Sequence, residues 1–532
     1  MSKTVSCFTI LQPVIDVRSL LNKLPSTSRE LLTSILSGMT FSLLGFWWIY
    51  KLDVLPGLHA DEAWSGLKAI QFQNDHLYQI TGMNNYTGIL QAGLAELSFG
   101  MFGKGVLQLR LGGVALNLAG LIILFFSIST KANRVRSLLF LLMIAQSALF
   151  VLSPRIAWEV NSFTLFLFSI TFASFLKIRR QPFKINHFWV FLFLLGNLLG
   201  TYNHVLFSCI PVSVFIGTLL WEARYKSRQY SPLVVLLAVN CFNLIVVFLS
   251  MRYFLESMAS QIGYVIFSAF LLLIFTTKCY FLLIGKVKCF NLNITKKMTI
   301  AIFALGISVF AIFHGIAFFQ LLSAYKIILQ IFSYECSTIT EITLSMVGCA
   351  VLACFLIQFA KDLKLKTIPV EIYWITCYLG VFCAYTISCS FRYYLSIYVL
   401  MAVYLACRIS FKTRVSRFFV ASIIIGFIIM QFIWYDIFIV GNFPLKAIDF
   451  KIGNRQKETT AHFLPKQPVI DFLKTNKTGQ IQYLIDEPYF VEQPILFYKT
   501  INPWDESNGK DIFLDYDHTS YKTGFLLYAL DD

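Results

Sequence analysis

Long apolar runs constrain the fold of this chain more than any other feature of its sequence. Runs of about 17–25 apolar residues are long enough to cross the hydrocarbon core of a bilayer as helices. Hydrophobic residues make up 57% of the chain and charged residues only 14%, which excludes a soluble globular protein of this length. We predict an all-α polytopic membrane protein of the following thirteen approximate spans: 32–50, 106–128, 137–152, 158–176, 187–202, 204–220, 232–250, 261–284, 298–323, 342–360, 369–388, 393–407 and 416–440.

Basic residues concentrate in alternate loops between these runs. If the N-terminus is cytoplasmic, each inner loop carries three to five Lys or Arg residues. The positive-inside rule therefore places the N-terminus in the cytoplasm and the C-terminus outside. The net charge of +16 is then mainly an orientation signal with some contact to membrane lipids, and we expect no nucleic acid partner. The predicted inner loops are 131–136, 177–184, 222–230, 278–297, 361–366 and 408–417.

The fifth and sixth runs are nearly continuous, because only Tyr202-Asn203-His204 divides them. One broken span at this place would change the parity and move several basic loops to the outer side. The distribution of positive charge therefore favours two separate spans.

The runs divide the chain into three regions. They are a cytoplasmic N-terminal segment (1–31), a transmembrane domain (32–440) and a small outer α/β domain (441–532). In the outer domain, Gln480–Ile485 and Ile495–Tyr498 have the composition of strands, and Pro468–Lys474 that of a short helix.

The loop 51–104 is the longest loop between the apolar runs. Two stretches in it, Glu62–Gln73 and Ile89–Phe102, have an amphipathic pattern that predicts helices in the membrane interface. Such helices would hold the carboxylates at the start of this loop against the bilayer rim.

Asp61 and Glu62 are adjacent carboxylates just beyond the first span. A carboxylate near an apolar rim can act as a general base on an acceptor hydroxyl or amine, so we predict both as catalytic residues. Carboxylates also bind hard divalent cations, and Glu62 with His59 would be the ligands of a metal ion. The alternative is a solvated helix start, where Asp and Glu are both favoured.

Three arginines, Arg110, Arg155 and Arg392, lie on the predicted outer side, where the positive-inside rule disfavours them. Together they suggest a phosphate or diphosphate site, because the guanidinium fork matches phosphate geometry. The alternative for any one of them is an anchor whose charged end reaches the interface.

Three further residues on the same side, Tyr86, His204 and Tyr393, could add hydrogen-bond donors to a bound substrate. For His204 the alternative is a packed residue at the end of a span.

The order of these motifs resembles that of the GT-C glycosyltransferases of the protein mannosyltransferase and aminoarabinose transferase type (family 39-like). The resemblance covers approximately residues 30–440. The chain departs from the family pattern at Tyr394-Leu395-Ser396-Ile397, where members often have a proline. The motifs are His59-Ala60-Asp61-Glu62-Ala63, Tyr86-Thr87-Gly88, Leu109-Arg110-Leu111, Ser153-Pro154-Arg155 and Phe391-Arg392-Tyr393-Tyr394-Leu395.

The resemblance implies transfer of a sugar from a polyprenyl-phosphate donor to a lipid, glycan or protein acceptor. By similarity, Asp61 would be the catalytic base or the group that orients the acceptor, Glu62 would assist it or bind metal, and the arginines would hold the lipid phosphate. A positive donor at that phosphate stabilises the charge it gains as the glycosidic bond breaks.

Two other classes of function compete with this interpretation. A transporter or flippase of a lipid-linked substrate would need ionisable residues near the middle of the bilayer, and these are sparse. A structural membrane subunit would not need the outer arginines. Compact loops favour a bacterial inner membrane, although an endoplasmic reticulum protein would have the same topology.

Overall fold

The computed structural model describes most of the apolar region and short parts of the tail. The described residues are 26–75, 79–84, 86–129, 134–180, 186–225, 231–253, 262–283, 294–324, 327–328, 337–385, 391–409, 414–440, 463–464, 481–482, 489–501 and 528–529.

Every predicted span contains at least one helix. Three of these helices begin at a capping residue, Asn186, Thr295 or Ser337, whose side chain accepts a hydrogen bond from a backbone N–H group of the first turn. The helices are α2 (Ser26–Ile49), α5 (Val106–Ile128), α6 (Arg134–Ala145), α7 (Ala148–Leu152), α8 (Glu159–Arg180), α9 (His187–Asn203), α10 (Cys209–Tyr225), α11 (Ser231–Tyr253), α12 (Ile262–Leu283), α13 (Lys296–Ser323), α15 (Thr338–Leu363), α16 (Val370–Tyr385), α17 (Leu395–Arg408) and α18 (Arg414–Tyr435).

Within the described residues, nine helices are long and apolar enough to cross a membrane, and a bent pair could make a tenth span. This bent pair occupies the span predicted over 137–152. Its two halves, Arg134–Ala145 and Ala148–Arg155, meet at 75° because the polar Gln146 and Ser147 interrupt the apolar run. The total of thirteen spans stays a prediction, since α9, α16 and α17 are shorter helices of 17, 16 and 14 residues.

The fifth and sixth predicted spans are separate helices. α9 ends at Asn203, and His204 has an extended backbone with φ −156° and ψ 127°. A 3₁₀ turn, η4 (Val205–Ser208), then leads into α10. The break therefore falls on the polar residues that the sequence marks.

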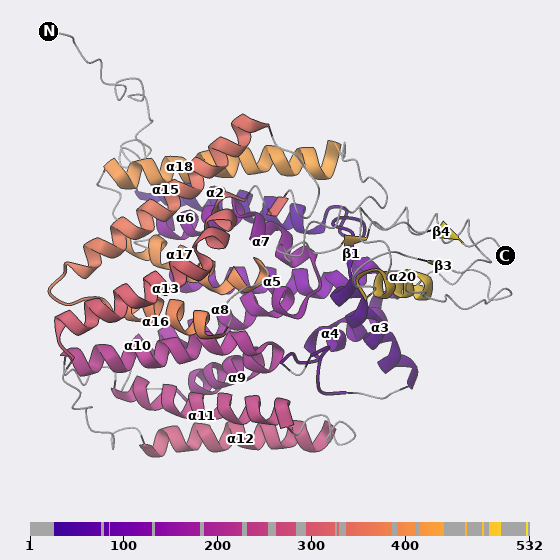
Figure 1. The fold of residues 1–532 in the computed structure, drawn as a ribbon, viewed down its shortest axis with the longest axis horizontal. Coiled ribbons are helices and arrows are strands. Elements are labelled where there is room, and N and C mark those ends of the chain that lie inside the picture. The colour runs from indigo at the N-terminus through magenta and orange to yellow at the C-terminus, as the bar shows by residue number, and fades with distance from the viewer. Residues whose placement is uncertain are drawn as a thin grey trace, which may run out of the picture.

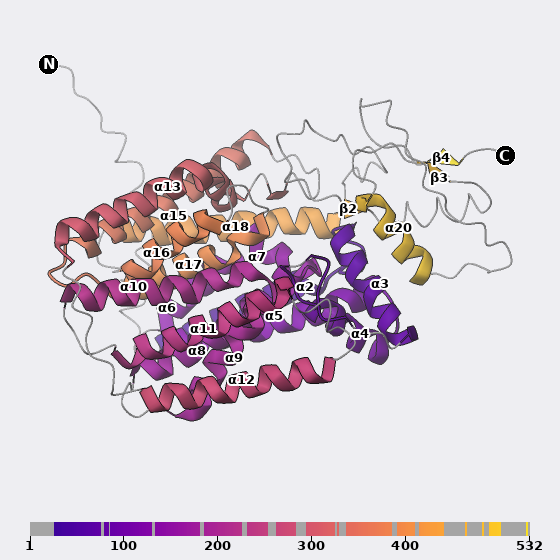
Figure 2. The ribbon, with the colours of Figure 1, turned by 60° about the horizontal axis from the view of Figure 1, so that its bottom comes forward.

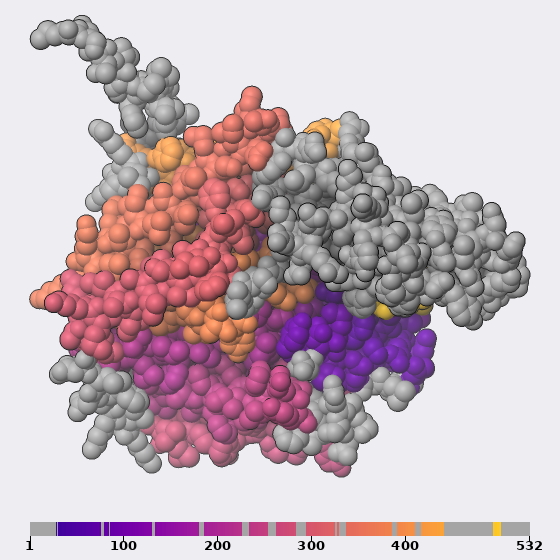
Figure 3. Space-filling view, viewed as in Figure 1, coloured from indigo at the N-terminus to yellow at the C-terminus, as the bar shows by residue number. Residues whose placement is uncertain are grey.

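The long helices lie side by side in one bundle (Figure 1). α5 packs against α8, α8 against α9, and α10 against α16, while α13 contacts α15 and α16. The loop 51–104 is called the first outer loop after its predicted side of the membrane. Its two helices, α3 (Ala60–Asp75) and α4 (Leu90–Phe102), lie at one end of the bundle in both views (Figures 1 and 2). Figure 3 shows the same pair as the indigo surface at that end. α3 and α4 confirm that the stretches Glu62–Gln73 and Ile89–Phe102 of this loop are helical.

The tail contributes short described elements near this end. Strand β2 (Phe463–Leu464) pairs antiparallel with β1 (Leu58–His59), and β3 (Ile481–Gln482) pairs with β4 (Tyr528–Ala529). The strand predicted over Gln480–Ile485 is thus present at two of its residues.

One strand prediction in the tail is wrong. Ile495–Tyr498 belongs to a helix, α20 (Tyr489–Ile501), which packs on α3. Its apolar side chains are buried by that contact, and a short apolar run cannot by itself distinguish a strand from a buried helix. The helix predicted over Pro468–Lys474 lies outside the described residues.

Candidate active site

The two adjacent carboxylates lie in the first turn of α3, directly after β1. The partial positive charge of a helix N-terminus favours carboxylates at this position. The pairing of β1 with β2 and the packing of α20 on α3 fix the start of the helix. Although the carboxylates are neighbours in the chain, Glu62 is fully buried and paired with Arg110, whereas Asp61 lines a cleft and is paired with Arg392.

Glu62 is fully buried and engaged on both carboxylate oxygens. Its Oε1 accepts from Arg110 Nε at 2.8 Å and from the Ala157 backbone N–H at 2.7 Å. Its Oε2 accepts from Arg110 Nη2 at 2.9 Å and from the His59 backbone N–H at 3.1 Å. A carboxylate that already accepts four hydrogen bonds in a dry site is suited to holding the fold together rather than to removing a proton.

Arg110 is also fully buried, and all five of its N–H donors have protein partners. Besides the two bonds to Glu62, its Nη1 donates to the carbonyls of Leu52 and Pro56 at 3.0 and 2.9 Å. Its Nη2 donates to the carbonyl of Gly57 at 2.8 Å. This arginine therefore ties the first outer loop to α5, and its geometry offers no donor to a phosphate.

Arg155 ends a 3₁₀ turn, η3 (Ser153–Arg155), and is buried against the end of α2. It donates to four backbone carbonyls, and its guanidinium carbon lies 4.3 Å from the centre of the Phe438 ring. These bonds fasten η3 to the last turn of α2 and to the residues that follow it. The four carbonyls are those of Trp47, Tyr50, Lys51 and Leu55.

Asp61 is nine-tenths buried but keeps one carboxylate oxygen available. Its Oδ2 accepts from Arg392 Nη1 at 3.0 Å. Its Oδ1 lies 3.9 Å from His59 Nδ1, which already accepts from the Asp61 backbone N–H and from Trp158 Nε1, each at 3.0 Å. Since both groups are acceptors there, Oδ1 has no hydrogen-bond partner among the described residues. Asp61 also lines a small cleft with Trp64 and Gln91.

Arg392 is brought to Asp61 by a 3₁₀ turn, η6 (Phe391–Tyr394), at the start of α17. Its guanidinium carbon lies 4.5 Å from the centre of the Trp158 ring and 5.2 Å from that of Tyr393. Its Nε is buried and has no hydrogen-bond partner among the described residues. Arg155 Nε likewise has no partner among the described residues, but Arg392 is the one of the three predicted arginines that contacts Asp61.

Two residues that were not predicted as site residues also reach this cleft. Glu159, at the start of α8, lines it beside Asp61, and both carboxylates favour the charged form of Arg392. Gln91 of α4 donates to the Leu109 carbonyl at 3.4 Å, while its buried Oε1 lacks a partner in the described part of the chain. In the sequence, Glu159 is an acid at the outer end of a span, and that is the one signal that could have identified it.

The rings of Tyr86, His204 and Tyr393 contact one another in series near Arg392. His204 meets Tyr86 edge-to-face and Tyr393 at a tilt. The ring centre of His204 lies 5.5 Å from that of Tyr86 and 5.2 Å from that of Tyr393. Burial, with a smaller effect of Arg392, lowers the pKa of His204 to about 3, so the imidazole is neutral. Burial and the neighbouring Tyr393 raise the pKa of the half-exposed Tyr86, which keeps its hydroxyl a donor.

His204 lies in a turn that is hydrogen-bonded to the first outer loop. Its Nδ1 accepts from the Leu206 backbone N–H at 3.2 Å, whereas its buried Nε2 has no partner in the described residues. Backbone hydrogen bonds link Tyr86 to Val205 and Gly88 to Asn203. The turn between α9 and α10 is thereby fastened to the first outer loop.

The metal site of His59 and Glu62 stays a prediction, and three of its possible ligand atoms have protein partners in this geometry. The Nδ1 of His59 and both oxygens of Glu62 already accept hydrogen bonds from protein donors. Across the described residues, no group of three or more His, Cys, Asp or Glu side chains could hold a metal ion. We derive no catalytic step that passes through a metal.

Comparison with known proteins gives matches in structure alone. No family model matches the sequence, and no curated protein matches it. The crystal structure of ArnT from Cupriavidus metallidurans in the apo state matches with a TM-score of 0.32 and 8% identity, covering 72% of this chain and 78% of that one. The structure of the same protein bound to undecaprenyl phosphate matches with a TM-score of 0.37 and 13% identity, covering 90% and 89%. With scores this low, the function is inferred from the residues of this chain.

Proposed function

We propose that this protein is a membrane glycosyltransferase that moves a sugar from a polyprenyl-phosphate donor to an acceptor at the Asp61 end of the bundle. One observation supports this most directly. Asp61 lines a cleft, with one carboxylate oxygen held by Arg392 and the other without a hydrogen-bond partner among the described residues, an arrangement suited to a general base. The same arginine has a buried Nε–H that could bind an anion.

In the proposed reaction, Asp61 Oδ1 accepts the proton of an acceptor hydroxyl or amine. The acceptor atom attacks the anomeric carbon of the sugar as the bond from that carbon to the phosphate oxygen breaks. The electron pair of the broken bond stays on the phosphate, and displacement from the opposite face inverts the anomeric carbon. The products are the glycosylated acceptor and the free polyprenyl phosphate, and no further reactant is needed.

Arg392 would stabilise the charge that develops on the leaving phosphate. A fixed guanidinium in a water-poor site costs no reorganisation at the moment of reaction, and this makes such groups effective. The ring of Trp158 and the hydroxyl of Tyr393 hold the guanidinium in place, the latter at 3.4 Å from Nη2. Glu159 would balance the positive charge of Arg392 when Asp61 becomes protonated.

In this mechanism Glu62, Arg110 and Arg155 support the site without touching the reacting atoms. Their buried contacts fix the first outer loop against α2, α5 and η3. The acceptor and the sugar follow from none of these contacts. Gln91 also lines the cleft, and its Oε1, which has no partner among the described residues, would accept from a substrate hydroxyl.

A lipid transporter is the alternative function. Every ion pair among the described residues lies at a helix end, in the first outer loop or in a short turn beside it. Transporters instead place ionisable side chains near the middle of the membrane, where broken helices meet. The ion pairs therefore favour the transferase.

The direct test is to identify lipid that copurifies with the protein. Mass spectrometry of an organic extract of purified wild type should detect a polyprenyl-phosphate sugar, and the amount should fall in Arg392→Gln. Incubation of that lipid with the protein and membrane extract should release polyprenyl phosphate. A lipid that binds but is never cleaved would instead favour the transporter.

A further inference from the structure

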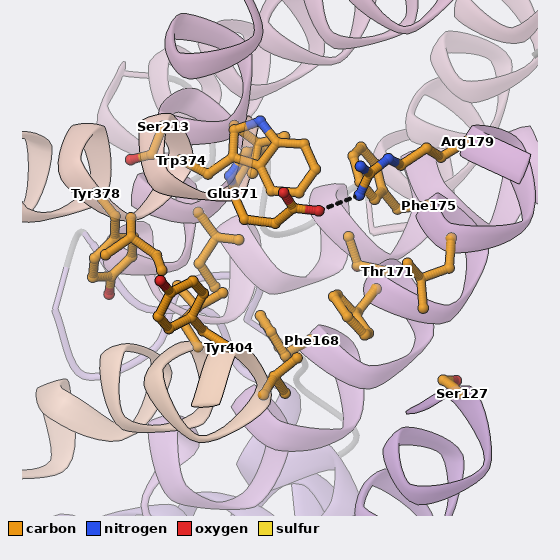
Figure 4. Close-up of a pocket in the computed structure, with 18 of the residues that line it drawn as sticks. Ser127, Phe168, Thr171, Phe175, Arg179, Ser213, Glu371, Trp374, Tyr378 and Tyr404 are labelled. Atoms are coloured by element: carbon orange, nitrogen blue, oxygen red, sulfur yellow. Dashed lines mark hydrogen bonds and ion pairs between the residues drawn. The ribbon is translucent and has the colours of Figure 1, made fainter. Parts of the chain in front are cut away.

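A large cavity lies inside the helix bundle, away from the Asp61 cleft (Figure 4). Its volume is about 250 Å³. Its wall is mainly aromatic and aliphatic, with Phe168, Phe175 and Trp374 among the largest side chains (Figure 4). A space of this size with an apolar wall suits a ligand with a hydrocarbon part.

The cavity and the Asp61 cleft have no lining residue in common. Along α8, Phe168 lies about two and a half turns beyond Glu159, roughly 13 Å at 1.5 Å per residue. The cavity continues along the same helix to Arg179, roughly 16 Å farther. It therefore occupies the half of the bundle that points away from the proposed reaction.

Charged side chains lie at the far end of this cavity. Arg179 donates to Glu371 at 2.7 Å (Figure 4), and Arg408 donates to both oxygens of Asp362 at 2.8 and 3.0 Å. The bonds of Arg408 use its Nε and Nη2. Its Nη1 has no partner within the described residues, and about a third of the side chain is exposed. A guanidinium with one open edge can still bind a phosphate oxygen.

We propose that this cavity binds one anionic glycerophospholipid of the surrounding membrane. An acyl chain lies among the aromatic side chains, and the phosphate contacts Arg408. The lipid is not a reactant in the proposed transfer, because its site is separate from Asp61. The inference therefore stands whether or not the protein is a glycosyltransferase.

Native mass spectrometry of delipidated protein tests this site. The probes are palmitoyl-oleoyl phosphatidylglycerol and phosphatidylcholine with the same acyl chains. We expect one phosphatidylglycerol per protein, bound roughly tenfold more tightly than phosphatidylcholine. Both lipids carry the phosphate, but the choline cation of phosphatidylcholine offsets its negative charge and is repelled by Arg408. Absence of a retained lipid, or equal binding of the two lipids, would overturn the proposal.

Three variants locate the binding. Val403→Trp fills the cavity from α17 and should lose the bound lipid, whereas Val440→Trp, on an exposed surface outside it, should keep it. Replacing both members of one ion pair, as in Arg408→Gln with Asp362→Asn, removes the cation without leaving a buried charge. This double variant should bind the two lipids equally, and a preserved preference for phosphatidylglycerol would exclude Arg408 as the phosphate contact.

Discussion

Arg392 Nη1 donates to Asp61 Oδ2 at 3.0 Å, across 331 residues of sequence. This bond joins the first outer loop to the start of α17. It also makes the two oxygens of one carboxylate unequal, because it anchors Oδ2 while Oδ1 has no hydrogen-bond partner among the described residues. Glu62, the next residue, has no such asymmetry, since both of its oxygens are engaged in a buried ion pair.

We expect Asp61→Asn to lower sugar transfer by roughly 100- to 10,000-fold, the usual contribution of a general base. The amide oxygen can still accept from Arg392, so the protein should fold and retain its donor lipid. Transfer of labelled sugar at matched protein concentration measures the effect. Asp75→Asn, at the exposed end of the same helix, is the control and should be fully active. An active Asp61→Asn protein would remove Asp61 from the mechanism.

Arg392→Gln should weaken the binding of polyprenyl phosphate by roughly 10- to 100-fold, because it removes a charge-assisted contact. Titration of the purified protein with polyprenyl phosphate measures the affinity. Arg392→Lys should recover only part of it, since an ammonium group cannot reproduce the guanidinium fork. Unchanged affinity in Arg392→Gln would place the phosphate elsewhere.

Glu62→Gln should destabilise the fold, because it leaves Arg110 buried without its counter-charge. Breaking a buried pair in this way costs about 3–5 kcal/mol. The thermal unfolding midpoint in detergent should therefore fall clearly. Glu30→Gln provides the control. Glu30 Oε2 lies 3.6 Å from Arg134 Nη1, and both side chains of this pair are more than a third exposed. That pair is worth about 1 kcal/mol or less. An equal effect of the two substitutions would contradict the structural role of Glu62.

The helices of this protein follow from its sequence, because long apolar runs in a membrane leave the backbone no other way to satisfy its hydrogen bonds. The first outer loop shows the same agreement, since its two amphipathic stretches are α3 and α4. The distribution of basic residues also predicts that Asp61 and Arg392 share one end of the bundle, where the structure brings them together.

The roles of individual charges could not be predicted in the same way. Arg110 and Arg392 are both cations at the outer ends of spans, yet one has five protein partners and the other has a donor left over. Only the three-dimensional neighbours separate them. The same limit explains Ile495–Tyr498, whose apolar run is compatible with a strand until α3 is known to cover it.

His204 should make stability depend on pH in acid solution. Its folded pKa of about 3 lies below the ordinary value of about 6.5, so the unfolded chain binds a proton in that interval and the folded protein does not. Stability from this group is complete above about pH 6.5 and declines as the pH falls toward 3, by at most about 1.4 kcal/mol per pH unit. His204→Gln should show a smaller decline in unfolding midpoint between pH 6.5 and 4. An identical decline would assign the pH dependence to other groups.

Gly66 on α3 should be required for the docking of α20. A Cβ built at Gly66 would overlap the buried ring of Phe497, whereas one built at Gly93 on α4 meets nothing within 4 Å. Gly66→Ala should therefore cost about 1–3 kcal/mol through overpacking, and Gly93→Ala should be neutral or slightly stabilising. Because α3 also carries Asp61, sugar transfer should fall with stability in Gly66→Ala.

Removal of the ring in the double variant Gly66→Ala with Phe497→Ala should relieve the overlap. The two substitutions together should therefore lower the unfolding midpoint by less than the sum of their separate effects. Strictly additive losses would show that Gly66 and Phe497 are not in contact.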